Sequence, residues 1–244
     1  MELYIIRHAQ SFNNALIDIR DRVMDPELTE LGQRQAQAIA HHLANGINPE
    51  MSVGMTEEDT SVRRRRGYGI TRIYCSAMVR ALQTAQPIGE ALGLAPEVWV
   101  DLHEHGGIYL DHGEEGGLVG YPGKTRSEIL AEFPGYVLPA EITEAGWWNR
   151  GHEDWPACQG RAIRVAGQLR QLAGRVGPDE RVAMVSHGGF INALLKALLH
   201  HLPSPDIFYH HFNTAITRLD FEPAGKLAVR HLNRIPHLSL ELVS

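Results

Sequence analysis

The 244-residue chain has few cysteines, no long apolar run and no excess of positive charge. Its two cysteines, Cys75 and Cys158, are too few for a disulfide framework and lack metal-type spacing, which is typical of the reducing cytosol. No stretch approaches the roughly 18 consecutive apolar residues of a membrane span. Glu2 and Arg7 interrupt the region where a signal peptide has its apolar core. We therefore expect a cytoplasmic protein that starts at Met1 and has no membrane partner.

The charge balance excludes a general binder of polyanions. Lys and Arg number 23 against 29 Asp and Glu, giving a formal charge of −6, whereas binding to nucleic acid or an anionic membrane needs a basic surface. The composition, 43% hydrophobic and 21% charged, is that of a globular protein. No linker poor in apolar residues divides the chain, so we predict a single domain over residues 1–244. The sequence leaves a homo-oligomer open.

Strands and helices alternate along the predicted domain. Short apolar runs predict strands at 3–6, 70–75, 181–185, 214–221 and 227–233. Apolar residues at helical spacing predict helices over 29–43, from about 76, over 162–176 and over 190–199. Thr29 is the expected N-cap of the first helix, Gly46 follows its end, and Pro87 predicts a kink or break in the second. The order predicts a three-layer α/β/α sandwich with a central mixed, mostly parallel sheet.

Two segments fall outside this alternation. Residues 47–69 carry an acidic run and then Arg63 to Arg66 without apolar periodicity, which predicts an inserted surface loop. Residues 105–159 are rich in Gly and Pro but contain Trp147, Trp148 and Trp155, which is too aromatic for a linker. We predict that this second insertion folds as a cap or lid over the site, with Trp147 and Trp148 packed inside it.

Polar residues follow three of the predicted strands. They are Arg7-His8, the segment from Ser76 to Arg80, and Ser186-His187-Gly188-Gly189. Ligands of open α/β sheets bind at the carboxyl ends of the strands, and helix starts there present free N–H groups to anions. Together these segments offer two arginines, two histidines and several N–H donors to one tetrahedral oxyanion.

Five motifs in order resemble those of the histidine phosphatase superfamily, the phosphoglycerate mutase-like proteins. Arg7-His8-Ala9-Gln10-Ser11 with Asn14 is similar to the RHG signature, and residues 25–36, DPELTELGQRQA, to the LTxxGxxQA helix start. Residues 74–85, YCSAMVRALQTA, resemble the SxxxRAxQTA segment. Leu102-His103-Glu104 resembles the L-x-E motif, and residues 185–189 resemble the second-histidine motif. The two insertions are not covered by this resemblance.

The resemblance implies a role for each matched residue. His8 attacks the phosphorus atom and forms a phosphohistidine, Arg7 and Arg80 clamp the phosphate, and His187 hydrogen-bonds the phosphoryl oxygens. Glu104 protonates the leaving group and later activates water. The phosphate pocket is completed by Asn14, Gln10, Ser11 and Gly188. Because the two arginines and His187 neutralise the phosphate, no metal or organic cofactor is expected, and the implied partner is a phosphorylated small molecule.

Several alternatives stay open. Glu114, Glu115, Glu141, Glu144 and Glu153 follow Glu104 and compete for its role. Asp101, His103, His105, Asp111 and His112 are metal-ligand types, but their spacing matches no metal motif. Lys124 and Arg126 are candidates for selecting an anionic substrate.

The main expectation is a phosphomonoester phosphatase, and two other functions compete with it. A phosphoglycerate mutase would use the same residues, but 12–24 lacks the Trp-Asn and Glu-Asn-Arg-Phe pattern of the cofactor-dependent mutases. A non-catalytic phospho-ligand binding module is supported only by Ala9, which stands where the family has Gly and where a methyl group could crowd the phosphate.

Overall fold

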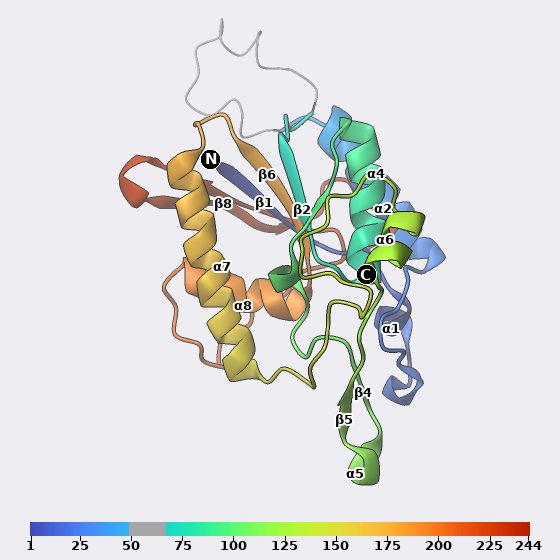
Figure 1. Cartoon of the computed structure of the whole chain (residues 1–244). Coiled ribbons are helices and arrows are strands. Elements are labelled where there is room, and N and C mark those ends of the chain that lie inside the picture. Colours follow the sequence, from blue (N-terminus) through green and yellow to red (C-terminus); the bar gives the residue numbers. More distant parts are fainter. Residues whose placement is uncertain (49–66) are drawn as a thin grey trace, which may run out of the picture.

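A mixed sheet forms the centre of the molecule (Figure 1). The computed structural model describes residues 1–48 and 67–244. In these residues a six-stranded sheet has the order β3-β2-β6-β1-β7-β8, and a separate hairpin pairs β4 with β5. The strands are β1 (Glu2–Arg7), β2 (Arg72–Cys75), β3 (Glu97–Val98), β4 (Tyr109–Asp111), β5 (Leu118–Gly120), β6 (Arg181–Ser186), β7 (Ile216–Phe221) and β8 (Leu227–Arg234). Strands β3, β2, β6 and β1 run parallel, and β7 and β8 are antiparallel to their neighbours, which confirms the predicted sheet.

Helices cover both faces of this sheet and complete the predicted three layers. The helices are α1 (Phe12–Ala15), α2 (Glu30–Asn45), α4 (Val79–Leu92), α5 (Gly113–Gly116), α6 (Arg126–Glu132), α7 (Trp155–Arg175) and α8 (Gly188–Leu198), with 3₁₀ turns η1 (Ile19–Asp21), η3 (Val100–Leu102), η4 (Pro223–Gly225) and η5 (Leu240–Leu242). Helices α2 and α4 lie on one face, and α7 and α8 lie on the other (Figure 1). None of the described helices is both long and apolar enough to cross a membrane.

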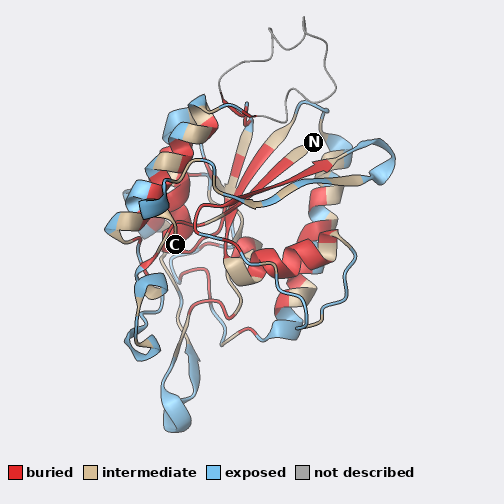
Figure 2. Ribbon diagram, turned by 180° about the vertical axis from the view of Figure 1, so that it is seen from behind, coloured by how far each residue is buried: buried red, intermediate tan, exposed pale blue. Residues whose placement is uncertain are grey.

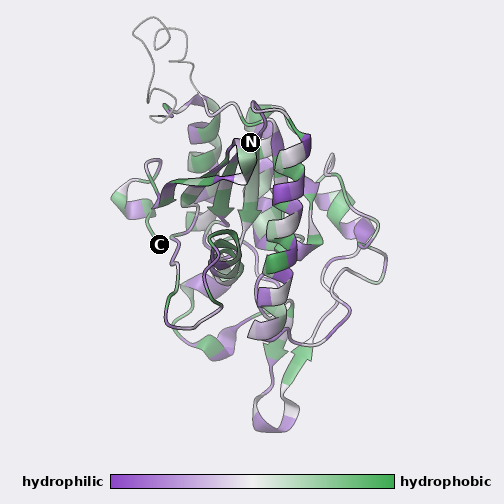
Figure 3. Cartoon of the chain, turned by 90° about the vertical axis from the view of Figure 1, so that its left-hand side faces the viewer, coloured by the Kyte–Doolittle hydropathy of each residue, from purple (hydrophilic) through white to green (hydrophobic). Residues whose placement is uncertain are grey.

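Alternation along β1 explains why both faces are covered. Side chains of a strand point to opposite faces in turn. Tyr4 and Ile6 belong to the core beneath α2 and α4, whereas Leu3 and Ile5 belong to the core beneath α7 and α8. Figure 2 shows the buried residues concentrated in the sheet and on the inner helix faces, and Figure 3 shows hydrophilic and hydrophobic residues alternating along α7, which faces the viewer.

Most helix boundaries follow the local sequence. Thr29 caps α2 by accepting a hydrogen bond from the Gly32 N–H, and Gly46 follows its last residue, as predicted. Of the kink or break predicted at Pro87, the break is wrong, because α4 continues to Leu92. Its apolar face on both sides of the proline is buried in one core, so packing holds the helix together despite the missing N–H.

The segment 105–159 consists of an exposed hairpin and a packed remainder. Strands β4 and β5 with α5 project from the molecule, and their tip is exposed (Figures 1 and 2). Ile129 and Phe133, from α6 and the residue after it, are buried in the core that contains α4. The Tyr136 hydroxyl donates to the Leu82 carbonyl at 2.7 Å. From Trp155 onward the chain is already in α7, which begins with Asp154 as its N-cap. Of the other insertion, 49–66, including Arg63 to Arg66, lies outside the described residues.

Candidate active site

A pocket of about 270 Å³ lies where β1 and β6 end. Arg7 and Ser186 are register partners at the ends of these parallel strands, so the residues after them meet at one edge of the sheet. His8, Arg7, Arg80 and Glu104 all line the pocket. His187 is fully buried beside it, with its ring centroid 4.9 Å from that of His8. The three strand-end segments singled out in the sequence therefore converge.

His8 is held as a neutral imidazole with a defined tautomer. Its Nδ1 lies 2.7 Å from the Ala9 carbonyl, which can only accept, so Nδ1 carries the proton. Nε2 then has the lone pair and accepts a hydrogen bond from Arg80 Nε at 3.2 Å. Burial first, and then the charges of Arg80 and Arg7, hold the pKa of His8 well below its usual range. An unprotonated nitrogen is thus available as a nucleophile at neutral pH.

Two guanidinium groups line the pocket together with His8. Arg7 Nη1 donates to the His211 carbonyl at 2.5 Å, while Arg7 Nε is buried with no partner among the described residues. Arg80 Nη1 lies 3.7 Å from Asp25 Oδ1. Burial lowers the pKa of both arginines, but a guanidinium remains charged at any working pH. The pocket thus concentrates positive charge around His8.

His187 has the least satisfied side chain of the site. It stands at the N-cap of α8, and neither of its ring nitrogens has a hydrogen-bond partner in the described part of the chain. Burial, Arg80 and His8 lower the pKa of His187, so its ring is neutral. Buried polar groups in proteins are nearly always paired, which makes two unpaired nitrogens on one ring a sign of a ligand site.

Glu104 lies across the pocket, at the start of α8. Its Oε1 accepts hydrogen bonds from the His105 and Phe190 N–H groups at 2.8 Å, and its Oε2 accepts from the Gly189 N–H at 3.1 Å. Of the competing carboxylates, Glu153 is paired with Arg161 outside the pocket. Among the described residues, Glu104 is the one glutamate that lines the pocket.

The remaining predicted phosphate ligands divide into two groups. Ser11 and Asn14 line the pocket, and the Ser11 hydroxyl donates to Asn14 Oδ1 at 3.1 Å. Gln10 is turned away, because its Oε1 accepts a hydrogen bond from the Thr29 hydroxyl at 2.7 Å. Gly188 is not one of the lining residues, and an added Cβ there would stand 3.5 Å from Arg7 Nε. The structure thus brings the first pair to the pocket and not the second.

Ala9 does not crowd the pocket. Its methyl group packs in a small buried cluster with Leu28 and Ala36, and its backbone is not in the positive-φ region that would require glycine. Its N–H donates to the Thr84 hydroxyl at 3.0 Å.

Sequence reasoning missed several residues around the pocket. Asp25 is the partner of Arg80, and burial raises its pKa to about 6. Its only signal was its place at the start of a recognised motif. Arg22 also lines the pocket, has no acidic partner among the described residues, and lies 5.7 Å from the Tyr109 ring across the mouth. His105 stacks on Trp155 at 3.9 Å.

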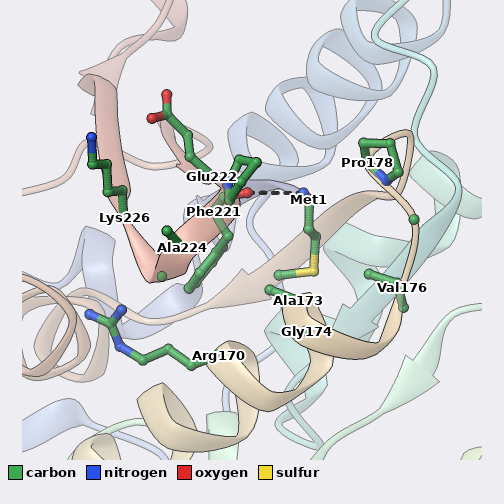
Figure 4. Close-up of a pocket in the computed structure, with 13 residues that line it drawn as sticks. Met1, Arg170, Ala173, Gly174, Val176, Pro178, Phe221, Glu222, Ala224 and Lys226 are labelled. Atoms are coloured by element: carbon green, nitrogen blue, oxygen red, sulfur yellow. Dashed lines mark hydrogen bonds between the residues drawn. The ribbon is translucent and has the colours of Figure 1, made fainter.

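Other candidate sites in the sequence are used differently. Lys124 pairs with Glu132, and Arg126 donates to the Pro139 carbonyl. Neither is among the residues that line the pocket. Within residues 1–48 and 67–244, no group of three or more His, Cys, Asp or Glu side chains is arranged to hold a metal. A larger cavity of about 380 Å³ lies beside the start of β1, at the opposite ends of the strands, where the Met1 amine donates to the Phe221 carbonyl (Figure 4). None of the described residues that line it is a histidine.

The chain belongs to the histidine phosphatase superfamily (branch 1), whose profile matches residues 3–53 and 51–234. It is 30% identical over 201 residues to the glucosyl-3-phosphoglycerate phosphatase of Mycobacterium tuberculosis, covering 81% of this chain and 74% of that protein. It is 26% identical over 230 residues to a probable phosphoglycerate mutase, GpmB, of Yersinia pestis, covering 93% of this chain and 88% of that one.

Two further comparisons differ in how much of this chain and of the related protein they cover. The PE-PGRS family protein PE_PGRS11 of Mycobacterium tuberculosis is 37% identical over 107 residues, and the match spans 43% of this chain but only 15% of that protein. The solved mycobacterial glucosyl-3-phosphoglycerate phosphatase superposes with a TM-score of 0.56 at 24% identity, covering 95% of this chain and 98% of that chain, which shows a shared fold.

Proposed function

We propose that this protein is a phosphomonoester phosphatase that works through a phosphohistidine on His8. One observation carries the proposal: the neutral nucleophilic nitrogen of His8 stands beside buried polar groups that have no partner in the described part of the chain, namely Arg7 Nε and the ring of His187, which when neutral can donate one hydrogen bond. These groups fit the oxygens of a phosphate dianion, which a buried positive site would neutralise.

The reaction proceeds in two displacements. In the first, the His8 Nε2 lone pair forms a bond to phosphorus while the bond to the leaving oxygen breaks, and that oxygen takes its electron pair and the proton of the Glu104 carboxyl. In the second, water attacks phosphorus and gives a proton to Glu104, and the N–P bond breaks with its electrons returning to Nε2. General acid catalysis of this kind is typically worth roughly 10²- to 10⁴-fold in rate. The products are an alcohol and inorganic phosphate.

We infer a phosphorylated small molecule as the substrate, with residues 105–159 acting as a cap over the mouth. Tyr109 of this segment and Arg22 contact each other across the opening, and Trp155 lines it. The cationic Arg22 favours an additional anionic group on the leaving alcohol. The charge of −6 argues against nucleic acid as a partner, and we place the enzyme in the cytoplasm.

A phosphoglycerate mutase is the second candidate, because a relative named as a probable mutase matches 93% of the chain. It would return the phosphoryl group from His8 to a second hydroxyl. Product analysis with 3-phosphoglycerate separates the two candidates, since the phosphatase releases phosphate whereas the mutase forms 2-phosphoglycerate faster than phosphate.

The first test compares wild type, His8→Ala and the control His41→Ala, an exposed histidine on α2. Each protein is mixed with p-nitrophenyl phosphate and a chelator, and released phosphate and acid-labile phosphoenzyme are measured. We expect both signals in wild type and in the control, and neither in His8→Ala. Turnover that persists without His8 refutes the phosphohistidine, and turnover lost to the chelator refutes metal-free catalysis. A non-catalytic phospho-ligand module predicts binding without turnover in every variant.

A further inference from the structure

A buried ion pair lies behind the active site. Arg161, in the second turn of α7, donates from Nε and Nη2 to the two carboxylate oxygens of Glu153, at 2.9 and 2.5 Å. The two side chains are 1% and 6% exposed, and neither residue lines the catalytic pocket. Buried pairs of this kind often give no net stability relative to apolar side chains, so stability alone does not account for this one.

The remaining donor of Arg161 holds the backbone that carries Glu104. Nη1 donates to the Asp101 carbonyl at 2.6 Å and to the His103 carbonyl at 2.9 Å. The Leu102 carbonyl between them accepts from the Ser186 hydroxyl at 2.8 Å. Here the chain leaves η3 and has no strand partner, so side chains take the place of a backbone ladder. The result is a segment fixed by hydrogen bonds immediately before Glu104.

The same pair also contacts the groups on the other side of Glu104. The Arg161 guanidinium lies over the Phe190 ring, 4.3 Å from its centroid, and the Phe190 N–H donates to Glu104 Oε1. The Glu153 N–H donates to the Gly106 carbonyl at 3.2 Å, which fixes the chain just after Glu104. Arg161 and Glu153 therefore touch the loop before Glu104, the loop after it, and the residue that binds its carboxylate.

We propose that Arg161 and Glu153 are positioning residues that hold Glu104 at the leaving oxygen of the substrate. The inference rests on the proposed function, because it assigns the pair to the proton donor of that reaction. It makes a specific demand: weakening the pair should slow phosphoryl transfer from substrates whose leaving group needs a proton and spare transfer from substrates whose leaving group does not. A merely structural pair would affect all substrates alike.

The test compares two leaving groups through kcat/KM, which reports the steps up to transfer of the phosphoryl group to His8. An alkyl phosphate such as glycerol phosphate leaves as an alkoxide and needs the Glu104 proton. p-Nitrophenyl phosphate leaves as a stable phenolate and does not. Glu104→Gln gives the full effect of losing the acid, and Arg161→Lys keeps the charge but loses the fork of donors.

Two additional variants guard against simple unfolding. Glu153→Leu combined with Arg161→Met removes both charges at similar volume, so no unpaired charge stays buried. Arg218→Lys is the matched control, because Arg218 is also buried and pairs in the same forked way with Asp220, on β7 outside the pocket. Circular dichroism and chemical denaturation establish that each variant is folded.

We expect Arg161→Lys and the double variant to lose about 10- to 100-fold in kcat/KM for the alkyl phosphate, less than the full general-acid effect of roughly 10²- to 10⁴-fold. For p-nitrophenyl phosphate the loss should stay within about 3-fold, and Arg218→Lys should leave the ratio of the two substrates unchanged. Equal losses on both substrates in a folded variant overturn the positioning role while the phosphatase function stands. A wild-type protein that hydrolyses neither substrate overturns the proposed function and this inference with it.

Discussion

Replacing Asp25 with asparagine should stabilise the protein at neutral pH. The Asp25 side chain is 10% exposed, and burial outweighs the nearby Arg80 charge, raising its pKa from 3.8 to about 6. The two values differ by about 2, and each pKa unit corresponds to about 1.4 kcal/mol, so keeping Asp25 ionised costs the folded state about 3 kcal/mol. Asparagine removes that charge but keeps the Oδ1 atom that accepts the Val79 N–H at 3.1 Å.

The effect has a defined pH dependence. A carboxyl group whose pKa is higher in the folded than in the unfolded chain binds more protons when folded. Its contribution to stability is complete below about pH 4 and is lost as the pH rises through about 6. We therefore expect Asp25→Asn to raise the free energy of unfolding by up to about 3 kcal/mol at pH 8 and to have little effect near pH 4.

Urea denaturation of wild type and variant at both pH values measures this difference. The control is Asp179→Asn, an exposed aspartate, which should change stability by less than about 0.5 kcal/mol at either pH. A variant that is less stable than wild type at pH 8, or that differs from it equally at both pH values, refutes the reasoning, because it shows that the Arg80 pairing outweighs the cost of burial.

Three further predictions concern the pocket and its supports. Arg22→Met should raise KM by about 2- to 5-fold for phosphomonoesters with a second anionic group, as expected for one exposed ion pair, and leave KM for p-nitrophenyl phosphate unchanged; equal changes for both contradict it. Gly107→Ala should lower the free energy of unfolding by at least about 2 kcal/mol in urea titrations, because Gly107 has φ +72° and a Cβ there would lie 2.1 Å from the Trp148 ring. Ala9→Gly should cost about 1 kcal/mol and leave kcat unchanged, since the methyl group packs away from the pocket; a rise in kcat would mean that the methyl group crowds the phosphate.

The main elements of the fold were readable from local patterns. The predicted strands at 3–6 and 181–185 and the helix after Thr29 match β1, β6 and α2 closely, because strong alternation and a good N-cap agree with the tertiary packing there. The missing N–H of Pro87 predicts a kink or break, but α4 does not end there, because its apolar face is buried on both sides of the proline. The helix-breaking tendency of a single residue is overridden where tertiary packing buries enough apolar surface on the helix.

The sequence predicted which side chains meet at the ends of regular strands. It did not predict the placement of side chains that depend on contacts outside those strands. Arg7 ends β1, and His8 and His187 directly follow the parallel strands β1 and β6, so topology alone brings the three together. Gln10 follows the same strand, but its side chain is held by Thr29, which no spacing rule reveals. Asp25 lies in an irregular segment whose path depends on distant contacts.

By itself, the sequence determined the three-layer α/β fold and the set of residues at the strand ends, because period, caps and motif order are local properties of the chain. Only the tertiary structure decided which groups face one another. It set the tautomer of His8 through the Ala9 carbonyl, and it buried the His187 ring where neither nitrogen has a partner among the described residues. It also joined Arg161 to the carbonyls before Glu104, about 60 residues earlier in the chain, because hydrogen bonds and desolvation depend on distances that folding alone creates.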